Sequence, residues 1–132
     1  MNTRQLTAAA LAATTTVLVG VATAAPASAK DGRVQASGSC STTGHWTIKA
    51  APEGSRIELQ LEVEAPRPGQ RWTVAVTDNG VAVLSTSRTS STTSQFSVRA
   101  LLPNRAGTDR LVATARNTVT GNVCRAAVSY AG

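Results

Sequence analysis

The feature that most restricts the fold of this chain is a strict alternation of apolar and polar side chains over residues 56–65. Ile57, Leu59, Leu61 and Val63 alternate there with charged or amide side chains. Because successive side chains of a β-strand point to opposite faces, this pattern predicts a strand with one buried and one solvated face. Strands of that kind are typical of antiparallel sheets.

The faces of this strand and of the next one can be predicted residue by residue. We expect the buried side chains to be those of Leu59, Leu61, Trp72, Val74 and Val76, and the solvated ones to be those of Glu58, Gln60 and Glu62. A shift of the strand register by one residue would exchange the two faces, so the burial of these side chains is a sharp test of the prediction.

Further short segments with period-two patterning occur along the chain, separated by turn-forming residues. They cover residues 33–36, 45–50, 70–77, 81–87, 95–102, 110–117 and 123–130. Asp78-Asn79-Gly80 is a hairpin signal, because Asn and Gly tolerate the positive φ of a tight turn. Residues 85–94 are rich in Ser and Thr, which predicts a loop or an exposed edge. Seven or eight short strands without helical spacing predict an all-β, antiparallel two-sheet sandwich of immunoglobulin-like type, with a small β-barrel as the alternative.

The first residues have the pattern of an export signal. Arg4 precedes an apolar stretch over residues 6–25, and Ala27-Ser28-Ala29 is a small-residue cleavage site. We therefore expect residues 1–29 to be cleaved after Ala29 and the protein to be secreted. The remaining residues 30–132 have the length of one domain and contain no expected transmembrane span.

Cys40 and Cys124 are the only cysteines. In an oxidising compartment they are expected to form a disulfide. A redox pair normally has closer spacing, and the charged residues before Cys40 argue against a lipidated cysteine. Because Asn122 stands where antibody domains have the tyrosine of their corner motif, we expect a bond that joins the two ends of the chain and does not link the sheets as in antibodies.

The net charge favours anionic partners. The chain has 13 Lys and Arg and 7 Asp and Glu, a formal net charge of +6, and loss of Arg4 with the signal leaves +5. The arginines are scattered and aromatic residues make up only 3% of the chain, which argues against nucleic-acid binding. An anionic extracellular surface or protein is the expected partner.

The chain also resembles a group of small secreted proteins of actinobacteria. The similarity involves segments 38–41, 46–49, 69–72, 78–80, 104–110 and 120–124, and these span nearly all of residues 30–132. The group is known only as uncharacterised secreted proteins, so the resemblance implies export and domain extent and supplies no active residue.

No combination of residues predicts catalysis or metal binding. His45 is the only histidine, and no nucleophile motif accompanies it and the possible acids Asp31, Asp78 and Asp109. The carboxylates of residues 58, 62 and 64 share a solvated face, where cross-strand ion pairs explain them. Zinc lacks ligands and no calcium loop is present. We therefore expect no catalytic, cofactor-binding or metal-binding residues.

The segment Asn104–Arg110 is the most distinctive loop. One interpretation is a turn in which Asn104 or Asp109 caps backbone N–H groups; the other is an arginine contact with an anion. If the protein has a contact surface, we expect it to contain Arg67, Arg71, Arg105 and Arg110. The function predicted is a secreted, non-enzymatic binding module of unknown ligand; the alternative is a small secreted enzyme or an enzyme inhibitor that uses the segment 66–69.

Overall fold

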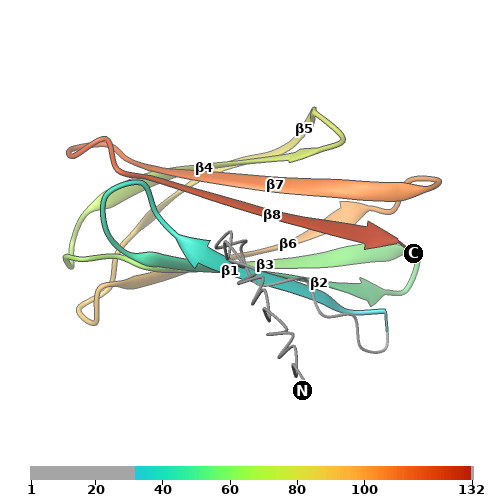
Figure 1. The fold of residues 1–132 in the computed structure, drawn as a ribbon, viewed down its shortest axis with the longest axis horizontal. Helices are drawn as coiled ribbons and strands as arrows, with labels where there is room; N and C mark the ends of the chain where they lie inside the picture. Colours follow the sequence, from blue (N-terminus) through green and yellow to red (C-terminus); the bar gives the residue numbers. More distant parts are fainter. Residues whose placement is uncertain (1–31, 132) are drawn as a thin grey trace, which may run out of the picture.

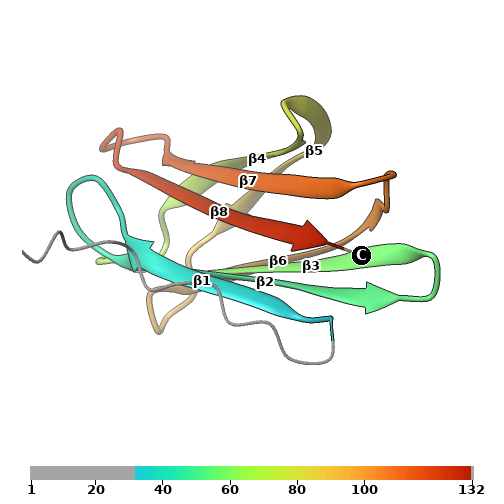
Figure 2. The ribbon, with the colours of Figure 1, turned by 45° about the vertical axis from the view of Figure 1, so that its right-hand side comes forward.

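The computed structural model describes residues 32–131, and these residues form two stacked antiparallel sheets (Figures 1 and 2). The strands are β1 (Val34–Ser39), β2 (His45–Glu53), β3 (Arg56–Glu64), β4 (Arg71–Asp78), β5 (Val81–Thr89), β6 (Gln95–Pro103), β7 (Thr108–Asn117) and β8 (Val123–Ala131). The first sheet has the order β1-β2-β3-β6 and the second has the order β5-β4-β7-β8. The predicted two-sheet sandwich is confirmed, and the described strands do not close into the alternative barrel.

The chain crosses from one sheet to the other after β3, after β5 and after β6. As a result β3 pairs with β6 and β4 pairs with β7, although other strands lie between them in the sequence. Such pairing of non-consecutive strands is the Greek-key pattern of immunoglobulin-like sandwiches.

The core lies between the sheets and contains the side chains predicted to be buried. Leu59, Trp72 and Val76 have no exposed surface, and Leu61 and Val74 keep 1%. The ring of Trp72 lies 5.4 Å from that of Phe96 on β6. Apolar faces from both sheets therefore meet in one continuous layer.

The polar face of β3 differs partly from the prediction. Glu62 is exposed as expected, whereas Glu58 and Gln60 are half-buried. β3 lies between β2 and β6, so long side chains from both neighbours cover its middle. Arg99 on β6, for example, places its Nε 3.3 Å from Glu58 Oε1.

The hairpin between β4 and β5 forms where the sequence predicts it. Asn79 and Gly80 have φ values of 49° and 83°. Two successive positive φ angles are those of the type I′ turn, whose twist matches that of the flanking strands.

The Ser- and Thr-rich segment 85–94 is divided between an edge strand and a turn. β5 continues to Thr89 and forms the edge of the second sheet. Arg88 reaches from this edge to the other sheet and donates a hydrogen bond from its Nε to the carbonyl oxygen of Ser97 on β6, at 3.2 Å. Arg88 thus ties β5 to β6 on one open side of the sandwich.

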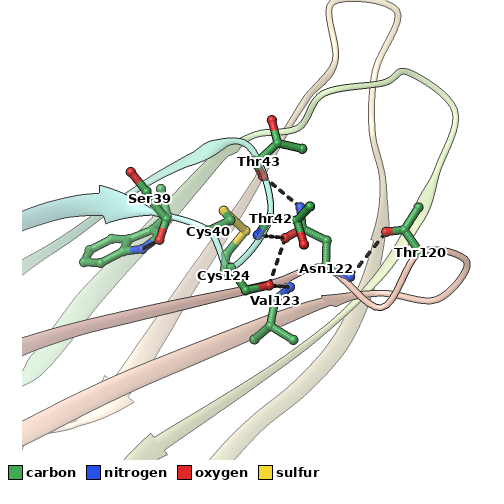
Figure 3. The surroundings of a disulfide bond; sticks show 10 residues. Ser39, Cys40, Thr42, Thr43, Thr120, Asn122, Val123 and Cys124 are labelled. Atoms are coloured by element: carbon green, nitrogen blue, oxygen red, sulfur yellow. Dashed lines mark hydrogen bonds between the residues drawn. A yellow bond between two sulfur atoms is a disulfide. The ribbon is translucent and has the colours of Figure 1, made fainter.

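The opposite side is closed by the predicted disulfide between Cys40 and Cys124 (Figure 3). Cys40 directly follows β1 of the first sheet, and Cys124 lies in β8 of the second. The bond joins the two ends of the described chain as expected, but the expectation that it would not link the sheets is wrong, because these two strands belong to different sheets.

A buried amide reinforces this junction. Asn122 accepts hydrogen bonds at Oδ1 from Ser41 Oγ and the Thr42 amide, and donates one from Nδ2 to the carbonyl of Thr43 (Figure 3). Asn122 thus fixes the β1–β2 loop to the turn before β8, next to the disulfide.

Candidate functional site

Charged side chains are distributed unequally over the two outer faces of the sandwich. Among the described residues the glutamates all belong to β2 and β3 of the first sheet: Glu53, Glu58, Glu62 and Glu64. The two described aspartates, Asp78 and Asp109, are buried between the sheets. The outer face of the second sheet therefore carries no acidic side chain in the described part of the chain.

That face carries four exposed arginines, which we call the arginine face: Arg71 on β4, Arg110 and Arg116 on β7, and Arg125 on β8. Each alternates with buried neighbours, so each points away from the core. The other outward residues of β4, β7 and β8 are uncharged, such as Thr73 and Thr114. No carboxylate of the described residues neutralises these cations on their own face.

Strand register sets the spacing of the arginine face. Arg116 pairs with Thr73, two residues beyond Arg71 on β4, and Arg125 pairs with Thr114, two residues before Arg116 on β7. Diagonal neighbours of this kind lie roughly 7 to 8 Å apart. Arg110 lies six residues before Arg116 on β7, and Arg71 lies two register positions beyond Arg116, so the stripe covers eight residues and extends over roughly 25 Å along the strands.

The structure divides the predicted contact residues between two ends of the sandwich. Arg67 and Arg71 lie in and after the turn between β3 and β4, while Arg105 and Arg110 lie at the other end of β4, beside its turn with β5. Only Arg71 and Arg110 belong to the arginine face. Arg105 points elsewhere, with its Nε 4.0 Å from the buried Asp78 Oδ2.

Arg116 and Arg125 are the members of the face that the sequence did not single out. Each lies on the polar face of its strand, and the adjacent Ala115 and Ala126 lie on the buried face. The alternation therefore identifies both arginines as outward-facing. The missing information was the order of the strands, because only pairing of β4 with β7 places Arg116 beside Arg71.

The turn at residues 66–69 is compact. The buried hydroxyl of Ser90 donates to the carbonyl of Arg67 at 2.8 Å and accepts from the amide of Gln70 at 2.9 Å. The amide of Gly69 also donates to the carbonyl of Ser90. The segment is folded back against Ser90, which does not give the extended loop that a protease inhibitor of the predicted kind would need.

His45 is exposed on the outer face of the first sheet, as expected. Its partners in register are Ser39 on β1 and Glu64 on β3. The three residues line a hollow of about 350 Å³. Within the described chain, no hydrogen bond or ion pair joins these three side chains, although a nucleophile, a base and its orienting acid would require such contacts.

A larger hollow lies on the same outer face. Its volume is about 570 Å³, and its lining combines Lys49 and Arg99 with Glu53 and Glu58. Arg99 and Glu58 form an ion pair, so these two charges compensate each other. The first sheet thus presents a face of mixed charge, in contrast to the arginine face.

Two buried carboxyl groups were not anticipated. Asp78 is the last residue of β4 and Asp109 is the second residue of β7, and neither has any exposed surface. Oδ1 and Oδ2 of Asp78 and Oδ2 of Asp109 have no hydrogen-bond donor among the described residues. The predicted cap is present, since the amide of Arg105 donates to Asp109 Oδ1 at 3.4 Å and Gly107 has a φ of 83°.

Several effects together raise the pKa of Asp78 from 3.8 to about 6, and the largest of them is burial. A hydrogen bond between the protonated Asp78 carboxyl and Asp109 and the negative charge of Asp109 also raise this pKa, whereas the positive charge of Arg105 lowers it. The largest effect is thus the removal of a carboxylate from water, and Arg105 compensates for it only in part.

Within residues 32–131, no three His, Cys, Asp or Glu side chains gather closely enough to hold a metal ion. The same residues contain no helix that is long and apolar enough to cross a membrane. The expected signal segment 1–29, its cleavage after Ala29 and the side chain of Asp31 lie outside the described residues.

Neither a protein-family model nor a curated protein matches this chain.

Proposed function

We propose that the protein is a secreted, non-enzymatic binding module whose arginine face engages an extended anionic polymer or surface. The observation that carries this proposal is the segregation of charge, with four exposed arginines on one sheet face and the described acidic residues elsewhere. Guanidinium groups bind carboxylates, phosphates and sulfates through paired hydrogen bonds. The disulfide supports export, since such bonds persist in oxidising compartments.

The dimensions of the arginine face favour a polymer over a small anion. A stripe of roughly 25 Å is longer than the screening length of about 10 Å at 0.1 M salt, so one small ion cannot interact with all four arginines. A chain of repeated anionic groups can contact them together. Binding should then weaken steeply as the salt concentration rises, because each contact releases counterions and because salt screens exposed charges.

Retention on dextran sulfate and polyphosphate matrices tests the proposal. Arg116→Gln with Arg125→Gln should lower the salt concentration needed for elution, because it removes the two central charges of the stripe. The matched control is Lys49→Gln with Arg56→Gln, which removes two exposed charges from the first sheet and should change elution less. Elution of both double variants at the same salt concentration would contradict a specific arginine face.

A small secreted enzyme is the second candidate, and one observation favours it. Ser39, His45 and Glu64 lie in one row across three adjacent strands and line a common hollow. A panel of ester, peptide and glycoside substrates tests this candidate against the His45→Ala variant. Hydrolysis that is lost in the variant would establish the enzyme and displace the binding module.

A further inference from the structure

Asp78 and Asp109 lie at the end of the sandwich where the β4–β5 turn meets the β6–β7 loop. Asn79, next to Asp78, accepts a hydrogen bond from the amide of Arg110 at 2.8 Å and donates one to the carbonyl of Thr108 at 3.1 Å. Asp109 in turn holds the amide of Arg105. The two aspartates therefore lie inside the contacts that hold this turn and this loop together.

The buried oxygens of the pair require an explanation, because an isolated buried carboxylate is strongly unfavourable. Oδ1 and Oδ2 of Asp78 and Oδ2 of Asp109 have neither exposure nor a donor in the described residues. Two ionised carboxylates facing each other would add repulsion to this cost. One proton removes the repulsion and pairs one oxygen of Asp78 with Oδ2 of Asp109, since a protonated carboxyl can donate a hydrogen bond to its neighbour.

The other groups at this end of the molecule do not replace that proton. Arg105 of the β6–β7 loop is half-exposed and its Nε is 4.0 Å from Asp78 Oδ2. From β8, Tyr130 pairs in register with Asp109, and from β5 the uncharged Val81 pairs with Asp78. In the β2–β3 hairpin, Glu53 and Arg56 are exposed and pair with each other in register.

We propose that Asp78 and Asp109 bind one proton between them and form a pH-sensitive latch that holds the β6–β7 loop against the β4–β5 turn. In the closed state the protonated Asp78 carboxyl donates a hydrogen bond to Oδ2 of Asp109. On deprotonation the proton passes to solvent, and two carboxylates remain with a single nearby guanidinium. The loop then moves outward until water reaches both groups, which frees the backbone around Arg105 and Arg110.

The direction of the stability change follows from the pKa of Asp78, which is about 6 in the folded protein and 3.8 ordinarily. Below about pH 4 the residue is protonated in both states. Between about pH 4 and pH 6 the folded protein keeps a proton that the unfolded chain has lost, so stability falls as the pH rises. Above about pH 6 this contribution is lost. The shift corresponds to a rise in the unfolding equilibrium constant on the order of 100-fold.

Urea unfolding of the full protein between pH 4 and pH 8 tests the latch. The Asp78→Asn variant should lack the fall in stability that the wild type shows between about pH 4 and pH 6, because an amide donates to Asp109 at every pH. The Glu62→Gln variant, which neutralises an exposed carboxylate, should follow the wild type. Parallel pH profiles for the wild type and Asp78→Asn would overturn the proposal.

Two further measurements use the wild type and do not depend on the folding of a variant. In a carbon-13 NMR titration, the Asp78 carboxyl should have its midpoint near pH 6, and a midpoint near 4 would overturn the latch. Amide exchange, corrected for its intrinsic pH dependence, should accelerate above about pH 6 at Arg105 and Arg110 and not at Ile48.

Calcium distinguishes a shared proton from a bound cation. Addition of calcium chloride at pH 7 should shift the urea midpoint of the wild type no more than it shifts the midpoint of Asp78→Asn. A calcium-dependent increase confined to the wild type would identify the pair as a cation site and overturn the proposal.

Discussion

Leu61 and Glu62 are adjacent in β3 but should contribute very differently to folding. Leu61 keeps 1% exposure and packs between the sheets, whereas Glu62 is exposed. Leu61→Ala should reduce the free energy of unfolding by about 2 to 4 kcal/mol, because it removes buried methyl groups and leaves a cavity. Glu62→Ala should cost less than about 1 kcal/mol. Urea unfolding of both variants measures the difference, and equal effects would contradict the orientation of β3.

For single residues, the sequence predicts which face of a strand a side chain occupies better than it predicts what surrounds that side chain. Alternation places Asp78 in phase with Val74 and Val76, and Asp109 in phase with Leu111, so the pattern itself indicates that both aspartates point inward. Their residue type suggested turn chemistry, and that interpretation was correct for the cap formed by Asp109. Mutual burial could not be predicted, because it depends on the pairing of β4 with β7.

Among the elements, β1 depends on a glycine that the sequence did not mark. Gly38 pairs with Trp46, and a Cβ atom at Gly38 would lie 2.6 Å from Cζ2 of the buried indole. The indole is also held by a hydrogen bond from its Nε1 to the carbonyl of Ser39. Gly38→Ala should therefore destabilise the protein by about 1 to 3 kcal/mol through overpacking.

Thermal unfolding compares this variant with Ser37→Ala, which changes an exposed position on the same strand. The serine variant should unfold close to the wild type. A Gly38→Ala protein as stable as the wild type would show that Trp46 and β1 can separate without cost.

The sequence places the ends of the strands near residues 38 and 89 too early, for a common reason. Ser- and Gly-rich strands gain their order from pairing and not from an apolar face.

For the whole molecule, the disulfide is the largest single constraint on the unfolded chain. Cys40 and Cys124 are 84 positions apart, and closing a loop of that length is worth up to about 4 to 5 kcal/mol in the chain-entropy model. Replacing both cysteines by serine should lower the unfolding midpoint and leave the circular dichroism of the strands unchanged. Loss of the β-sheet spectrum at low temperature would show that the sandwich requires the bond to form.

The sequence predicted the sandwich, the hairpin at Asn79 and the cysteine pairing because each depends on local patterning or on composition. It did not predict the arginine face or the link between sheets. Both depend on which strands become neighbours, and β7 joins β4 across two intervening strands. Non-local pairing of this kind leaves no periodic signal in the chain.

The position of the disulfide also determines how the molecule responds to mechanical force. A pull applied at residue 33 and at residue 131 passes along β1, through the bond between Cys40 and Cys124, and out along β8. The strands from β2 to β7 lie within the covalent loop and carry none of this tension directly. The bond prevents the 84 residues between the cysteines from extending, which amounts to roughly 290 Å of chain length. Under force the two terminal strands can therefore detach, but the rest of the chain cannot be stretched.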